Sequence, residues 1–206
     1  MLNTEVLVMK KQKGFTLIEL IVVIAIIGIL LAVLVPTWGY FIMKANLRTQ
    51  NNYSKVIFNA AQTQVTRLEA REKRDYSIAV DGDDDARKRL WMGDKSIMDD
   101  KGNFEYVIYW DGDSVQHYAL DGSLLSADSG PAIDFAKAVN KVFGESKNTV
   151  YKIYVKNYKV QSVCSSRYEL DDVIGSYPVI QDGRSEDETV LDFDPTTIVL
   201  ATEPTT

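Results

Sequence analysis

Residues 15 to 35, FTLIELIVVIAIIGILLAVLV, are the stretch that decides the architecture of this chain. Glu19 is the single charged residue among these 21 positions. As a helix, the stretch would extend about 32 Å at 1.5 Å per residue, which matches the roughly 30 Å hydrocarbon core of a bilayer. The sequence therefore predicts one membrane-spanning helix near the N-terminus.

The helical pattern continues beyond the apolar stretch. Apolar residues recur there at three- and four-residue spacing, namely Tyr53, Ile57, Ala60 or Ala61, Val65 and Leu68. This spacing places them in one stripe, with charged residues mostly off it. The stripe predicts an amphipathic helix that packs on a folded domain.

Pro36 stands between the two helical patterns. A proline inside a helix removes one backbone hydrogen bond and usually kinks the axis. We therefore expect one helix over residues 15 to about 72, bent or loosened at Pro36. Its transmembrane half is residues 15–35 and its amphipathic half is residues 36–74.

The remainder predicts an α+β domain with a small antiparallel sheet, packed against the amphipathic half of the long helix. Residues rich in β-formers predict strands at 103–110, 114–120, 149–160, 161–168 and 173–180. The turn residues Asp111, Gly112 and Asp113 predict a hairpin between the first two strands. We expect this head to cover residues 75–194 and to be followed by a mobile tail at 195–206.

A second, shorter helix is predicted at residues 131–143, PAIDFAKAVNKVF. Its apolar residues have helical spacing, Ser129 is a candidate N-cap, and Pro131 suits the first turn. Gly144 is expected to end this helix.

Charge and cysteine content exclude several classes of function. The net charge is −6, and residues 1–14 hold three lysines against Glu5, so their removal would take away +2 and leave −8. Such an acidic balance argues against nucleic acid as a partner, because phosphate-backbone binding needs clustered Lys and Arg. Cys164 is the only cysteine, so no disulfide within the chain is possible.

The leader and the apolar stretch together read KKQKGFTLIEL from Lys10 to Leu20, followed by uninterrupted apolar residues and then Pro36. This pattern resembles the prepilin processing signature of type IV pilins and of the pseudopilins of type II secretion. The resemblance covers about residues 10–36. The head matches no motif, and it lacks the paired C-terminal cysteines of many Gram-negative pilins.

The resemblance implies a structural subunit, not an enzyme, with no cofactor. A prepilin peptidase would cut after Gly14 and methylate the new amine of Phe15, leaving Glu19 fifth in the trimmed chain and Pro36 at a helix-loosening position. The implied partners are copies of the chain and other pilins, a platform membrane protein and an assembly ATPase. The precursor would be a single-pass protein of the cytoplasmic membrane with its head outside, and the assembled subunit would lie in a surface or envelope filament.

Glu19 is the residue whose physics points most directly to function. A carboxylate within a bilayer costs about 2.5–3.5 kcal/mol on insertion scales, so it is expected to have a cationic partner. No Lys or Arg lies between residues 15 and 35, and the amine of Phe15, freed by cleavage, is the obvious candidate. The alternative is that Glu19, one turn into the span, reaches back to the membrane surface.

Other arrangements of polar residues offer only weak candidate sites. Asp81, Asp83 and Asp85 imitate the start of a calcium-binding loop, but Ala86 stands where glycine belongs and the bidentate glutamate is missing. They are weak metal candidates. His117 is expected to be a packed or surface residue rather than a base, and nothing in the spacing supports a nucleophile pair with Cys164.

Two hypotheses that assign the chain to other classes of protein are alternatives to a pilin. One is a single-span, membrane-anchored binding or sensor protein that keeps its leader. The other is a secreted enzyme with an ordinary signal peptide, which would be cut after the apolar stretch. The N-terminal residue of the mature protein distinguishes all three.

Overall fold

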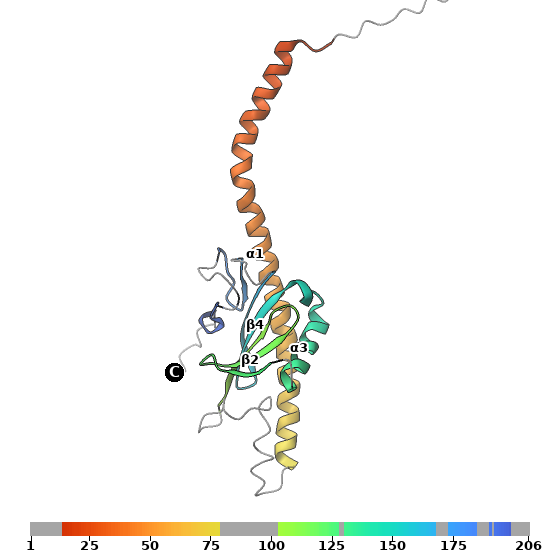
Figure 1. The fold of residues 1–206 in the computed structure, drawn as a ribbon, viewed down its shortest axis with the longest axis vertical. Coiled ribbons are helices and arrows are strands. Elements are labelled where there is room, and N and C mark those ends of the chain that lie inside the picture. Colours follow the sequence, from red (N-terminus) through yellow and green to blue (C-terminus); the bar gives the residue numbers. More distant parts are fainter. Residues whose placement is uncertain are drawn as a thin grey trace, which may run out of the picture. The chain divides into compact units, whose positions relative to one another are not determined.

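The computed structural model describes residues 14–78, 103–127, 130–167, 173–184, 190 and 192–198. The chain divides into two compact units, Met1–Ile42 and Met43–Thr206. Figure 1 shows the elements, which are α1 (Leu17–Ile78), β1 (Glu105–Trp110), β2 (Val115–Ala119), β3 (Leu124–Ala127), α3 (Gly130–Phe143), η1 (Ser146–Asn148), β4 (Val150–Lys156), β5 (Lys159–Ser166), β6 (Gly175–Tyr177) and η2 (Pro195–Ile198). The predicted α+β class, a long apolar N-terminal helix followed by a small antiparallel sheet, is confirmed.

The first unit contains the apolar part of α1. Its side chains from Phe15 to Val35 are all exposed, although they are almost entirely apolar. The helix is long and apolar enough to cross a membrane. Exposed apolar side chains on every side of a helix are typical of a segment whose surroundings are lipid or other helices rather than water.

The second unit is built on a six-stranded antiparallel sheet with the order β3-β2-β1-β4-β5-β6. The predicted hairpin between β1 and β2 is confirmed. Asp111 Oδ1 accepts hydrogen bonds from the backbone N–H groups of Asp113 at 2.9 Å and Ser114 at 2.7 Å, which closes the turn. Burial raises the pKa of Asp111, but the bonds from Ser114 and Asp113 outweigh it and hold the pKa below its usual value.

The strand predicted over residues 149–160 is two strands, so that prediction was wrong. β4 ends at Lys156, and the chain turns through Asn157 and Tyr158, whose φ angles are 46° and 61°, into β5. Two-residue hairpins favour such left-handed pairs, but their usual sequence signal includes glycine, which is absent here. The Asn157 side chain compensates by accepting a hydrogen bond from the N–H of Phe104 at 2.9 Å.

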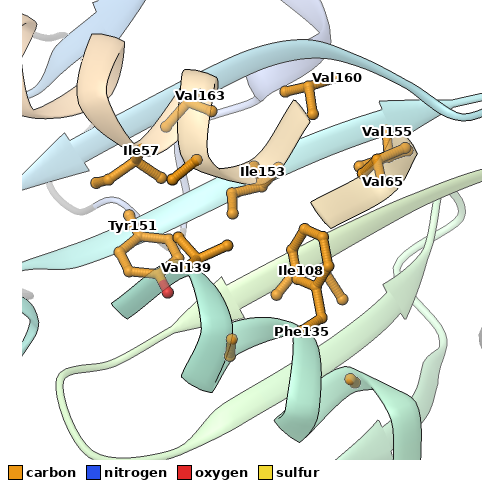
Figure 2. Packing of buried hydrophobic residues seen from close by; sticks show 14 of the residues in the cluster. Ile57, Val65, Ile108, Phe135, Val139, Tyr151, Ile153, Val155, Val160 and Val163 are labelled. Atoms are coloured by element: carbon orange, nitrogen blue, oxygen red, sulfur yellow. The ribbon is translucent and has the colours of Figure 1, made fainter. Parts of the chain in front are cut away.

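The main core lies between the sheet and the two helices. Figure 2 shows Ile57 and Val65 of α1 and Phe135 and Val139 of α3 directed toward the side chains of β1, β4 and β5. The predicted stripe on α1 is confirmed, because Ile57, Ala61 and Val65 are fully buried. Each large apolar side chain buried in this way contributes about 1.5–3 kcal/mol.

A smaller apolar cluster covers the opposite face of the sheet. It consists of Tyr109, Val150, Cys164, Ile174, Val190 and Phe193. The segment near the C-terminus that contains Phe193 lies on this face, and so does the buried Pro195 at the start of η2. The Ser162 hydroxyl donates a hydrogen bond to the carbonyl of Pro195. The sheet is therefore buried on both faces. The rest of the stretch proposed as a tail, residues 199–206, lies outside the described residues.

The N-terminal part of α1 in the second unit is attached to the sheet through polar side chains. Gln50, Asn51 and Ser54 are buried. Ser54 Oγ donates to the carbonyl of Gly175 at 3.0 Å, and Asn51 Oδ1 accepts the N–H of Ser176 at 2.8 Å. These bonds join the helix to the edge strand β6.

A chain that begins at Lys44 is expected to fold as a soluble monomer, because it retains these contacts and the buried Leu47 while losing the exposed apolar stretch. A chain that begins at Tyr53 is the matched control. It lacks Leu47, Gln50 and Asn51, and loss of one buried leucine alone costs about 2–5 kcal/mol. Urea denaturation followed by circular dichroism should show a cooperative transition for the first chain and a much lower midpoint for the second. Equal midpoints would show that residues 44–52 add no stability.

Candidate functional site

The candidate site is the start of α1. Gly14, Phe15 and Thr16 precede the first helical residue, Leu17. A side-chain carbon placed on Gly14 would have no atom within 4 Å, and the Phe15 side chain is 90% exposed. The peptide bond between Gly14 and Phe15 therefore lies in accessible, non-helical backbone that a peptidase can reach.

Glu19 and Thr16 form a capping box at this helix end. The Glu19 carboxylate accepts hydrogen bonds from the Thr16 N–H at 2.7 Å and from the Thr16 hydroxyl at 2.8 Å. The Glu19 N–H in turn donates to Thr16 Oγ1 at 3.3 Å. This reciprocal pair satisfies backbone donors that have no partner inside the helix. A carboxylate in the first turn also interacts favourably with the positive end of the helix dipole.

The capping box was missed in the sequence, although its signal was present. Threonine followed three residues later by glutamate, just before an apolar helix, is the recognised pattern. Because both Thr16 donors lie on the C-terminal side of the Gly14–Phe15 bond, cutting that bond would leave the cap intact. In the described chain, the partner of the Glu19 carboxylate is thus the neutral Thr16. The sequence alone predicts a cationic partner, because a carboxylate in a bilayer is costly.

Pro36 lies in the interior of α1, which continues through it. Proline has no N–H to donate to the carbonyl four residues before it. Thr37 adds side-chain hydrogen bonds to this turn of the helix. Its hydroxyl donates to the carbonyl of Leu34 at 2.9 Å and more weakly to that of Val33 at 3.4 Å. Such bonds from threonine to its own helix often accompany bending. A kink at Pro36 remains a prediction.

The remaining candidates do not join this site. Asp81, Asp83 and Asp85 lie outside the described residues. The described residues themselves contain no group of three or more potential metal ligands. His117 is buried and its ring packs edge-to-face on Tyr106 at 5.0 Å. The strand register aligns His117 with Ile153 and Val163, so the adjacent Cys164 points to the opposite face of the sheet. A Cys164–His117 pair is therefore excluded by geometry.

Comparison with known proteins places the same segment in a defined class. Residues 9–35 match the family model of the prokaryotic N-terminal methylation motif. The chain is 39% identical over 64 residues to a fimbrial protein of Pseudomonas aeruginosa, which is 31% of this chain and 40% of that protein. It is 60% identical over 37 residues to the type IV major alpha-pilin of Moraxella bovis, which is 18% of this chain and 23% of that protein.

The chain thus carries the N-terminal segment found in type IV pilins and fimbrial proteins, as the sequence motif indicated. It spans less than half the length of the relatives it matches. These relatives are structural fimbrial proteins rather than enzymes. No solved structure matches the chain.

Proposed function

We propose that this protein is a pilin precursor that is trimmed between Gly14 and Phe15 and then assembled into a helical filament, either a type IV pilus or a pseudopilus. One observation carries the proposal. The Gly14–Phe15 bond, at which we propose cleavage, lies in exposed, non-helical backbone, directly before a capped helix whose side chains from Leu17 to Val35 are all exposed.

Processing would require a prepilin peptidase at the cytoplasmic face of the membrane. The exposed Gly14 presents no side chain to the enzyme, and the apolar helix would hold the substrate in the bilayer at a constant depth. The same enzyme would methylate the new amine of Phe15. Assembly would then depend on a platform membrane protein and an assembly ATPase, the partners that the resemblance to pilins implies.

Glu19 would supply the register for assembly. After trimming, the positively charged amine of Phe15 becomes available, and it can approach the Glu19 carboxylate of the same or a neighbouring subunit. Removal of both charges from water consumes much of their attraction, so the pair sets register rather than filament stability. Stability would come from packing of the apolar parts of α1 in the filament.

The precursor and the free subunit would lie in the cytoplasmic membrane as single-pass proteins, with residues 43–206 on the extracytoplasmic side. The basic residues do not decide this orientation by themselves. Lys10, Lys11 and Lys13 before the span are matched by Lys44, Arg48 and Lys55 after it. Orientation instead follows from cleavage of the leader at the cytoplasmic face.

Gly14→Val is expected to leave the chain at full length, because a branched side chain beside the scissile bond would no longer fit the peptidase. Gly28→Val is the matched control. A side chain at Gly28 would also meet nothing within 4 Å, but this glycine lies 14 positions further along, inside the helix. Immunoblots of cells that contain the peptidase should show precursor for Gly14→Val and trimmed protein for Gly28→Val. Normal trimming of Gly14→Val would contradict the proposed site.

Mass spectrometry of the mature wild-type N-terminus tests the function itself. A methylated Phe15 supports the pilin. An intact Met1 would instead identify the membrane-anchored binding or sensor protein, and a start beyond about residue 38 would identify a secreted protein released by signal peptidase.

A further inference from the structure

Three aromatic residues follow the apolar stretch on α1. Trp38, Tyr40 and Phe41 are 66%, 56% and 65% exposed, and the rings of Tyr40 and Phe41 contact each other edge-to-face at 6.1 Å. Large aromatic side chains are normally buried or half-buried in a folded protein, because each can remove about 150–250 Å² of surface from water. Three of them exposed in one short segment offer a large apolar surface to the surroundings of this part of α1.

The three rings are spread over one side of the helix. At 3.6 residues per turn, Phe41 lies about 60° from Trp38 around the axis, and Tyr40 lies about 160° from Trp38 in the same direction. The rings therefore span an arc of about 160°, a little less than half of the circumference. Trp38 and Phe41 have the three-residue spacing of a stripe that packs on one neighbouring helix, but Tyr40, two residues from Trp38, lies off that stripe. The arc is therefore broader than a contact with one helix requires.

The position of the rings along the helix matches the far edge of a bilayer. Glu19 and Trp38 are 19 residues apart, which corresponds to about 28 Å of helix, close to the roughly 30 Å hydrocarbon core. Between them every residue is uncharged. Trp and Tyr are enriched where acyl chains meet headgroups, since their rings are apolar and their N–H or O–H groups need a polar partner.

We propose that Trp38, Tyr40 and Phe41 form an aromatic collar that binds the headgroup–acyl boundary of a phospholipid bilayer and sets the depth of the free subunit. The occupant in the free subunit is lipid, because the rings lie about 28 Å of helix from Glu19, close to the thickness of a hydrocarbon core, and because Trp and Tyr favour its headgroup boundary. With the collar at one boundary, Glu19 lies just inside the opposite boundary, because about 28 Å of helix fits within the roughly 30 Å core. The inference rests on the proposed membrane-inserted subunit.

The test uses the full chain in phosphatidylcholine vesicles whose acyl chains are brominated either near the headgroup or near the methyl end. Bromine quenches tryptophan emission at short range. The difference between wild type and Trp38→Phe isolates the signal of Trp38, because Trp91 and Trp110 are present in both proteins. We expect several-fold stronger quenching by the bromines near the headgroup. Stronger quenching by the methyl-end bromines, or none by either lipid, would overturn the collar, and the latter would point to a second protein chain as its partner.

A second measurement asks whether the collar sets the depth. In Ala45→Cys, the new thiol lies on an exposed position just beyond the collar, whereas Cys164 is fully buried. A water-soluble maleimide should label this thiol several-fold more slowly when Trp38, Tyr40 and Phe41 are all replaced by Leu, because the apolar stretch is then longer and free to slide. Equal labelling rates would contradict the proposal.

Flotation of the vesicles separates failure of this inference from failure of the proposed function. A chain that does not float with lipid would overturn the membrane-inserted subunit. A chain that floats but shows the wrong quenching pattern would overturn the collar alone.

Discussion

Gly175→Val is expected to destabilise the second unit by on the order of 3–5 kcal/mol, a large fraction of the 5–15 kcal/mol that holds a typical domain together. A side-chain carbon at Gly175 would lie 2.6 Å from Gln50 Cβ and closer still to the backbone carbon of Gln50 and the backbone nitrogen of Asn51. Backbone atoms of a helix cannot rotate away as a side chain would. Strand β6 and helix α1 would have to separate.

Separation would also break the hydrogen bonds that join these elements. Ser54 Oγ donates to the Gly175 carbonyl and lies 2.8 Å from Ser165 Oγ, while Asn51 Oδ1 accepts the N–H of Ser176. Each bond contributes a net of about 0.5–1.5 kcal/mol, and a buried group left without a partner costs more. The strain and the lost bonds therefore act together.

Urea denaturation of the chain that begins at Lys44 measures this effect. Gly183→Val is the matched control, since a side chain there would meet nothing within 4 Å and the substitution should change stability by no more than about 0.5 kcal/mol. We expect Gly175→Val to be unfolded or to unfold at a far lower urea concentration than the control. Coincident transitions for the two variants would show that β6 does not pack against α1 as described.

Glu19→Ala is expected to abolish filaments while leaving the precursor correctly trimmed. The substitution removes the one charge of the apolar stretch, which makes insertion into the bilayer easier by up to about 2.5–3.5 kcal/mol. It also removes the carboxylate that would guide the amine of an incoming Phe15. The bond between Gly14 and Phe15 is unchanged, so processing should continue.

Glu19→Gln separates the two roles of this side chain. The amide oxygen of glutamine can still accept the Thr16 N–H, so the capping box is retained, but the negative charge is lost. Loss of the cap alone would cost about 0.5–2 kcal/mol at the helix end. If the charge sets register, both variants fail to assemble. If the cap is what matters, Glu19→Gln makes filaments and Glu19→Ala does not.

The measurement is the yield of filaments sheared from cells that contain no wild-type copy, after mass spectrometry has confirmed cleavage behind Gly14 in each variant. Wild-type yield from fully trimmed Glu19→Ala would rule out both the register and the cap as requirements. It would favour the alternative in which the Glu19 carboxylate lies at the membrane surface and takes no part in assembly.

The elements that the sequence predicted correctly are those specified by neighbours along the chain. The apolar stretch at residues 15–35, the stripe through Ile57 and Val65, and the end of α3 at Gly144 all follow from local periodicity or backbone preference. Gly144 has a φ of 81°, and its N–H donates to the Asn140 carbonyl at 2.9 Å, as expected for a glycine that ends a helix. The candidate site is still a prediction, and it is a local one as well, because Gly14, Phe15 and Glu19 lie within six residues of one another.

Only the tertiary structure decided which polar residues are buried and where the strands turn. Gln50, Asn51 and Ser54 have the composition of an exposed helix face, yet they are buried because β6, more than 120 residues later, brings its backbone against them. Tyr158 accepts a left-handed conformation because its ring packs on Phe104 at 4.8 Å, which offsets the local strain. In both cases contacts between distant residues outweigh the local preference, and such contacts leave no periodic signal in the sequence.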